Sequence, residues 1–126
     1  MRCALALAVC FALVGCDSVD PRELPGTYYW HSKTVMDAIT IRPNHTYAHV
    51  VGRPDGQTIR EEGTWEFEMI EDRPHVTFAN FRFYSRAPGQ PAPMDTPGLW
   101  PALIERSSDG LILVVNLDLG TYYGPR

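Results

Sequence analysis

The chain has 126 residues, with 11 basic and 15 acidic side chains and a formal net charge of −4. This length suits one domain, and the acidic balance argues against nucleic acid as a partner, because nucleic-acid binding requires clustered basic residues. The three cysteines, Cys3, Cys10 and Cys16, all lie in the first sixteen residues. The rest of the chain therefore has no cysteine with which to form a disulfide or a thiolate metal site.

The first fifteen residues have the pattern of a secretory signal peptide. Arg2 is followed by thirteen apolar or small residues, from Cys3 to Gly15, and acidic residues begin at Asp17. A membrane-spanning helix needs about 20 apolar residues, so this run is too short to span a bilayer. A charged start, a short apolar middle and a small-residue end instead predict a cleaved signal over residues 1–15. A buried N-terminal helix is the alternative.

The run ends in Leu13-Val14-Gly15-Cys16, which resembles the lipobox of bacterial lipoproteins. The resemblance implies that the Cys16 sulfur receives a diacylglycerol, that the chain is cut before Cys16, and that the new amine is acylated by a fatty acid such as palmitate. Several acyl chains, at about 0.8 kcal/mol per buried CH₂, give firm anchoring to a bilayer. Asp17 resembles the enterobacterial retention signal, and it favours the periplasmic face of the inner membrane over the outer membrane.

Residues 16–25 are polar and contain two prolines. They predict a lipidated cysteine followed by a short tether between the bilayer and the folded domain. Cleavage would leave 10 basic and 15 acidic residues, a net charge of −5. The remaining residues, 26–126, are predicted to form a single antiparallel β-domain.

From residue 26 onward, apolar and polar residues alternate with the period of half-buried strands. In the segment 64–69, this places Trp65, Phe67 and Met69 on the inner face. Short segments separated by turn residues favour an all-β antiparallel meander of about seven to eight strands, curling into a small barrel or half-barrel. The pattern predicts strands at 26–33, 37–42, 46–53, 58–70, 75–85, 102–107 and 111–119, with a short closing segment at 121–123.

Three details of these strands can be predicted. Gly63 lies inside the longest strand, which suggests a bulge or corner. The alternation slips between Phe78 and Phe81, which predicts a second bulge near Ala79-Asn80. In the last long strand, the odd-numbered residues from Leu111 to Leu119 are all apolar, and we expect them to share one face.

The segments GTYYW, ITIRPNHTY and GTWEFE, at 26–30, 39–47 and 63–68, resemble the opening of small lipocalin-like bacterial domains. The resemblance implies an antiparallel barrel or half-barrel. It leaves open whether the strands close around a cavity that could hold an apolar ligand.

The segment APGQPAPMDTPGLWP, residues 87–101, contains five prolines and is predicted to be a long loop. Loops of this length are often functional, and an exposed tryptophan is a typical binding anchor. In the alternative interpretation, Leu99 and Trp100 cover the open end of the sheet. The candidate residues for binding a ligand or partner are Trp30, Trp65, Phe67, Met94, Leu99 and Trp100.

No residue pattern points firmly to catalysis, a metal or a cofactor. His45 and His49 are predicted on a turn and the strand after it, about 13 Å apart, so solvated histidines are favoured over a metal site. Glu62, Glu66 and Glu68 can share one strand face and divide acid and base roles. Such a row is more often the solvated face of an antiparallel strand.

The sequence therefore predicts a membrane-anchored periplasmic lipoprotein that acts as a non-enzymatic binding module for a partner protein or an apolar ligand. The alternatives are an envelope structural or assembly factor, an immunity-type inhibitor that neutralises a toxin, and a hydrolase that uses the glutamate row.

Overall fold

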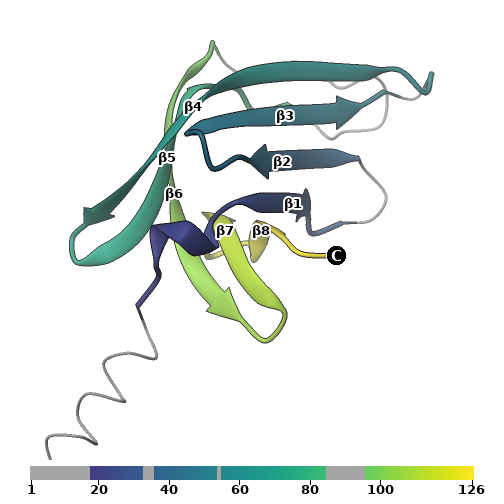
Figure 1. The fold of residues 1–126 in the computed structure, drawn as a ribbon. Helices are drawn as coiled ribbons and strands as arrows, with labels where there is room; N and C mark the ends of the chain where they lie inside the picture. The colour runs from purple at the N-terminus through teal and green to yellow at the C-terminus, as the bar shows by residue number, and fades with distance from the viewer. Residues whose placement is uncertain (1–17, 33–35, 54, 85–95) are drawn as a thin grey trace, which may run out of the picture.

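The computed structural model describes residues 18–32, 36–53, 55–84 and 96–126. A short 3-10 helix precedes eight strands that pair antiparallel in chain order, and β1 also pairs with β8, which closes the barrel (Figure 1). The elements are η1 (Pro21–Glu23), β1 (Gly26–Trp30), β2 (Asp37–Ile41), β3 (Thr46–Gly52), β4 (Thr58–Ile70), β5 (Arg73–Phe81), β6 (Gly98–Ser107), β7 (Gly110–Asn116) and β8 (Thr121–Gly124). The predicted all-β antiparallel fold is confirmed, in its closed form.

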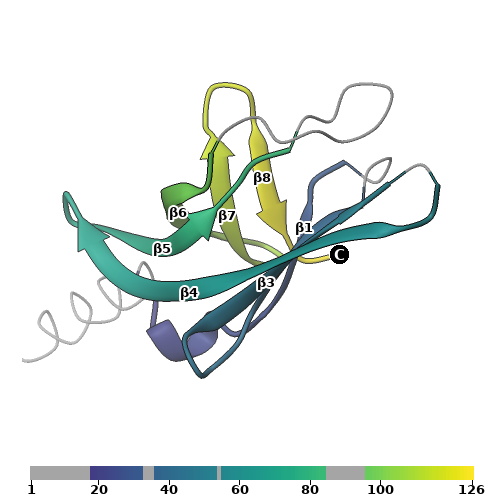
Figure 2. The same cartoon turned by 90° about the horizontal axis from the view of Figure 1, so that it is seen from above.

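The barrel has two distinct ends because successive strands run in opposite directions. Helix η1 and the β2–β3, β4–β5 and β6–β7 turns lie at one end, which we call the η1 end. The connections β1–β2, β3–β4, β5–β6 and β7–β8 lie at the other, which we call the far end. Figure 2 shows the β4–β5 hairpin and the β7–β8 turn pointing in different directions from the body of the barrel.

Aromatic side chains fill much of the barrel interior. Trp65 faces Phe78 across the β4–β5 pair, and both are buried, as the alternation in β4 predicted for Trp65. The ring of Tyr47 meets the ring of Phe78 edge-on, with 4.9 Å between their centroids. Edge-to-face pairs of this kind add to the stability given by burial alone.

The bulge predicted near Ala79-Asn80 is confirmed. Of the two alternatives predicted at Gly63, a bulge or a corner, the bulge is wrong. The β5–β6 register shifts between Phe78 and Phe81, and Asn80 has a φ of 55°. Gly63 instead stays in register opposite Tyr47. A glycine is needed there because the Tyr47 ring and the Ala79 carbonyl occupy the space of a side chain.

The predicted inner face of the last long strand is right only as far as β7 extends. Leu111 and Leu113 are buried, but β7 ends at Asn116, and Leu117 and Leu119 are exposed. The chain turns there because the Asn116 side chain accepts hydrogen bonds from the backbone N–H groups of residues 118 and 119. Asparagine side chains commonly form such turns, and the alternation beyond Asn116 no longer reports the inner face.

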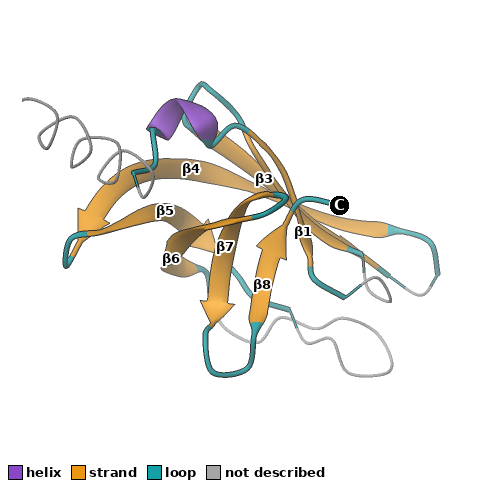
Figure 3. Cartoon of the chain, turned by 90° about the horizontal axis from the view of Figure 1, so that it is seen from below, coloured by secondary structure: helices purple, strands orange, loops and turns teal. Residues whose placement is uncertain are grey.

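Helix η1 is docked on the end of the barrel (Figure 3). A capping box joins Asp20 and Glu23, and Leu24 is fully buried in the core. The hydroxyl of Tyr28 donates to the Leu24 carbonyl at 2.7 Å, and burial raises the pKa of Tyr28 to about 12. Residues 18–25, the described part of the predicted tether, are therefore attached to the barrel.

Candidate functional site

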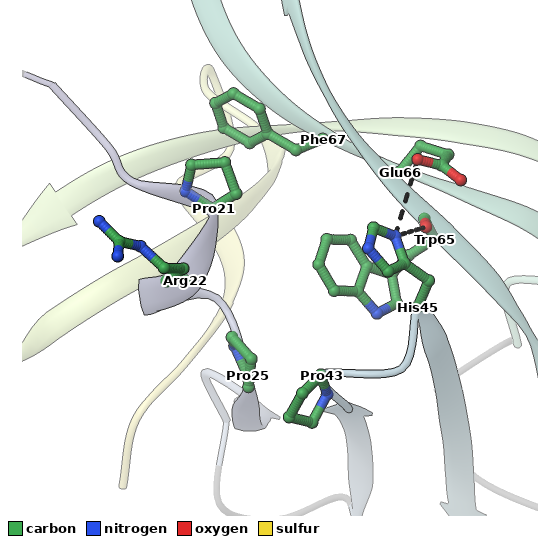
Figure 4. Close-up of a pocket in the computed structure, with 8 residues that line it drawn as sticks. All are labelled: Pro21, Arg22, Pro25, Pro43, His45, Trp65, Glu66 and Phe67. Atoms are coloured by element: carbon green, nitrogen blue, oxygen red, sulfur yellow. Dashed lines mark hydrogen bonds and ion pairs between the residues drawn. The ribbon is translucent and has the colours of Figure 1, made fainter.

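An open groove with mainly apolar walls lies at the η1 end of the barrel (Figure 4). Its volume is about 530 Å³, which is within the usual range of about 300–1,000 Å³ for small-molecule sites. The residues that line it are Pro21, Arg22, Pro25, Pro43, His45, Trp65, Glu66 and Phe67.

The groove forms because β4 extends beyond its neighbour β3. The first residue of β3, Thr46, pairs with Thr64, and the Trp65 N–H donates to the carbonyl of His45 at 2.9 Å, so β4 has no β3 partner from Glu66 onward. Trp65 and Phe67 belong to the inner face of β4. Three prolines complete the walls: Pro21 of η1, Pro25 between η1 and β1, and Pro43 of the β2–β3 turn.

The polar atoms of the groove wall largely bond to one another. The imidazole of His45 stacks on the Trp65 ring, with 4.6 Å between centroids and 12° between planes. Its Nδ1 lies 3.3 Å from the Trp65 carbonyl and 3.7 Å from the Glu66 carboxylate. The Trp65 indole N–H donates to the Arg42 carbonyl at 2.9 Å. These bonds hold the wall in place. Trp65 itself is only 3% exposed, so the exposed imidazole of His45 and the half-buried ring of Phe67 are the aromatic groups that a ligand can contact.

The structure does not bring the predicted binding residues together in one site. Trp65 and Phe67 meet in the groove. Trp30 and Trp100 instead both pack against Tyr123, with ring centroids 5.3 and 6.0 Å from it. Leu99 is exposed near the start of β6, and Met94 lies outside the described residues. The segment predicted as a loop over 87–101 thus ends earlier, because β6 begins at Gly98.

A buried polar network that the sequence did not predict lies inside the barrel. Asp37 and His49 are each 1% exposed. The Asp37 Oδ1 lies 2.8 Å from His49 Nε2 and accepts a hydrogen bond from the Tyr123 hydroxyl at 2.9 Å. The His49 ring stacks on Phe81, with 4.6 Å between centroids. The prediction that His49 is solvated was wrong, because His49 shares the inner face of β3 with Tyr47 and Val51.

The glutamate row lies on the outer face of β4. Glu62, Glu66 and Glu68 are exposed, and Gly63 does not shift their phase. Glu62 forms ion pairs with Arg60 at 3.0 Å and Arg42 at 3.6 Å, and the hydrogen bond from Arg60 lowers the pKa of Glu62. Glu68 accepts a hydrogen bond from Thr77. These partners are those of a solvated strand face.

Within the described parts of the chain, no three histidine, cysteine or acidic side chains gather closely enough to hold a metal ion. No helix in those same parts has the length and apolar character needed to cross a membrane. Comparison of the sequence and the fold with family models, with curated proteins and with solved structures gave no match.

Proposed function

We propose that the protein is a lipoprotein of the bacterial cell envelope, anchored through acylated Cys16, whose barrel is a non-enzymatic binding module for an apolar ligand. Asp17 favours the periplasmic face of the inner membrane as its location. The observation that supports a ligand most directly is the groove of about 530 Å³ at the η1 end. Its aromatic and proline walls suit a ligand bound mainly by burial of apolar surface.

The chemistry of the groove favours binding over catalysis. Its histidine and its indole N–H already have partners within the wall. Of the glutamate row only Glu66 lines the groove, where its carboxylate lies 3.7 Å from His45 Nδ1. A ligand would gain about 25 cal/mol for each Å² of apolar surface removed from water. Apolar contact is thus the main source of affinity that the groove offers.

A partner protein is the second candidate, and one observation favours it. The β7–β8 turn exposes Leu117 and Leu119 at the far end, and the Asn116 side chain holds this turn in shape. Closure of the barrel leaves little free strand edge for a partner to extend, so such a partner would bind mainly through side chains of this kind. An envelope assembly factor or an immunity-type inhibitor would fit this second candidate.

The groove is tested with the mature chain carrying Cys16→Ser and an apolar fluorescent probe such as a naphthalene sulfonate dye. We expect Phe67→Ala to weaken probe binding about tenfold, because losing much of one buried aromatic contact costs roughly 1.4 kcal/mol or more. Phe83→Ala is the matched control, since Phe83 packs on Phe81 and Trp100 away from the groove. Equal affinities for the two variants would show that the probe does not bind in the groove.

The anchor is tested separately by following the full-length protein in bacterial cells fed an alkyne analogue of palmitate. We expect Cys16→Ala to abolish incorporation of the label and to leave the barrel in the supernatant after the membranes are sedimented, because the acyl chains supply the anchoring free energy. Cys10→Ala, in the predicted leader, is the control and should remain labelled. Cys16→Ala protein that stays with the membranes after a high-salt wash would contradict the lipid anchor.

A further inference from the structure

We propose that the η1 end of the barrel is a second, non-covalent contact with the bilayer, so that the barrel stands on the membrane with Met69 and the rim of the groove at the lipid interface. This inference rests on the proposed lipid anchor at Cys16. It adds an orientation of the barrel, a set of contacting residues and a partner, namely the lipid surface of the membrane to which the chain is attached.

The first support is the short distance between the docked chain and the predicted anchor. The Ser18 carbonyl accepts a hydrogen bond from Arg106 at 3.1 Å, and the same guanidinium pairs with Glu23 at 3.0 Å. Val19 packs against the core. Two residue steps, at most about 7 Å of chain, separate Ser18 from Cys16. An acylated Cys16 would thus hold the η1 end close to the bilayer.

The second support is the apolar surface beside the docked chain. Met69 precedes the β4–β5 turn and is 58% exposed. Among the described residues, the other large exposed apolar side chains lie at the far end, namely Met36, Leu99, Leu117, Leu119 and Tyr122, so the choice of the η1 end rests on the docked chain. Phe67 lies two residues before Met69 on the same face of β4 and is half-buried. Pro21 and Pro43 lie across the groove from each other, on η1 and the β2–β3 turn (Figure 4). Apolar side chains of peripheral proteins enter the headgroup region to a depth of about 5–10 Å.

The charge at this end is consistent with an apolar contact and not with an electrostatic one. Four ion pairs lie there, namely Arg22–Asp20 at 2.7 Å, Arg106–Glu23 at 3.0 Å, Arg73–Glu105 at 3.2 Å and Arg42–Glu62 at 3.6 Å. Glu66, Glu68, Glu71, Asp72 and Asp109 lie at the same end and give it an excess of negative charge. The contact is therefore apolar and does not depend on anionic lipids.

The orientation also explains how the groove would obtain its ligand. The groove and the apolar rim lie at the same end of the barrel, so an apolar molecule dissolved in the bilayer can enter the groove without crossing bulk water. Free transfer through water is slow for such molecules because exposing apolar surface is unfavourable.

The experiment uses the processed, lipidated protein in phosphatidylcholine vesicles, with an environment-sensitive fluorophore on a single introduced cysteine. Met69→Cys and Leu117→Cys are a matched pair, since both side chains are 58% exposed and lie at opposite ends of the barrel. In processed protein, Cys3 and Cys10 are removed with the leader and Cys16 is alkylated. The introduced cysteine is therefore the only free thiol. Lipids that bear a spin label near the headgroup serve as the quencher.

We expect the probe at residue 69 to shift to shorter wavelength and to lose most of its emission to the spin-labelled lipid, and the probe at residue 117 to be almost unaffected. The difference should persist in 1 M salt, because an apolar contact is not screened. Protein that floats with the vesicles but shows no quenching at 69, or stronger quenching at 117, overturns the orientation alone. Protein that fails to float contradicts the lipid anchor, and the orientation with it.

Discussion

Replacing Asp37 with alanine is expected to lower the free energy of unfolding by about 3–5 kcal/mol, the cost of removing one partner from a buried polar pair. The loss is a large part of the roughly 5–15 kcal/mol that stabilises a typical domain. The side chain is 1% exposed and bonds to both His49 and Tyr123. Without it, the His49 ring nitrogen and the Tyr123 hydroxyl each lose one hydrogen bond in the barrel interior. Each unsatisfied group costs about 1–3 kcal/mol.

Urea denaturation followed by tryptophan fluorescence measures this loss. Asp118→Ala is the control, because Asp118 is exposed on the β7–β8 turn, and surface substitutions usually change stability by no more than about 0.5 kcal/mol. We also expect Asp37→Leu combined with His49→Phe and Tyr123→Phe to recover much of the loss, since the polar groups are then removed together. Equal midpoints for Asp37→Ala and Asp118→Ala would contradict a stabilising role of the network.

The strands of this barrel could be predicted because their signal is local. Alternation and turn residues predicted β4 at 58–70, which is where it lies, and the slip between Phe78 and Phe81 located the bulge in β5. Closure depends instead on the pairing of Tyr29 with Gly124 and of Trp30 with Tyr123. These pairs join the two ends of the domain, and no local pattern specifies them.

The alternation in β2 and β3 indicated that Asp37 and His49 face inward, but their polar side chains obscured this signal. Asp37 has the same parity as the buried Ile39 and Ile41, and His49 has the same parity as the buried Tyr47 and Val51. Parity alone would have placed both on the inner face. Polar residues are usually assigned to the solvent, because burying them without partners is costly. Here the partners of Asp37 come from the neighbouring strand β3 and from β8, 86 residues away, so only the fold reveals the network.

Two residues of the groove could be predicted from the sequence, but the groove itself could not. Trp65 and Phe67 were candidates from composition and alternation, but the site itself arises from a length mismatch between β3 and β4 and from the docking of η1. Docking of η1 depends on Leu24 entering the core and on Arg106, more than eighty residues away, binding Ser18 and Glu23. Residues 16–25 resemble a tether in sequence because their few apolar residues do not recur with a regular spacing.

Gly63→Ala is expected to destabilise the barrel by about 3 kcal/mol, which is the order of cost for an overpacked core combined with a lost buried hydrogen bond. A Cβ at this position would lie 2.6 Å from the Ala79 carbonyl oxygen, 2.8 Å from Cε1 of Tyr47 and 2.9 Å from its hydroxyl oxygen. The Tyr47 hydroxyl donates to that same carbonyl at 2.7 Å. The added methyl group therefore pushes on both members of the bond that ties β3 to the β5 bulge.

Thermal and urea unfolding of Gly63→Ala should be compared with Gly98→Ala, since a Cβ on Gly98 meets nothing within 4 Å. We expect the second variant to be as stable as the parent or slightly more so, because alanine has less conformational freedom in the unfolded chain. Adding Tyr47→Phe to Gly63→Ala should cost less than the sum of the single changes, because both act on the same bond. Unchanged stability in Gly63→Ala would mean that the bulge moves freely, and that Tyr47 does not fix its position.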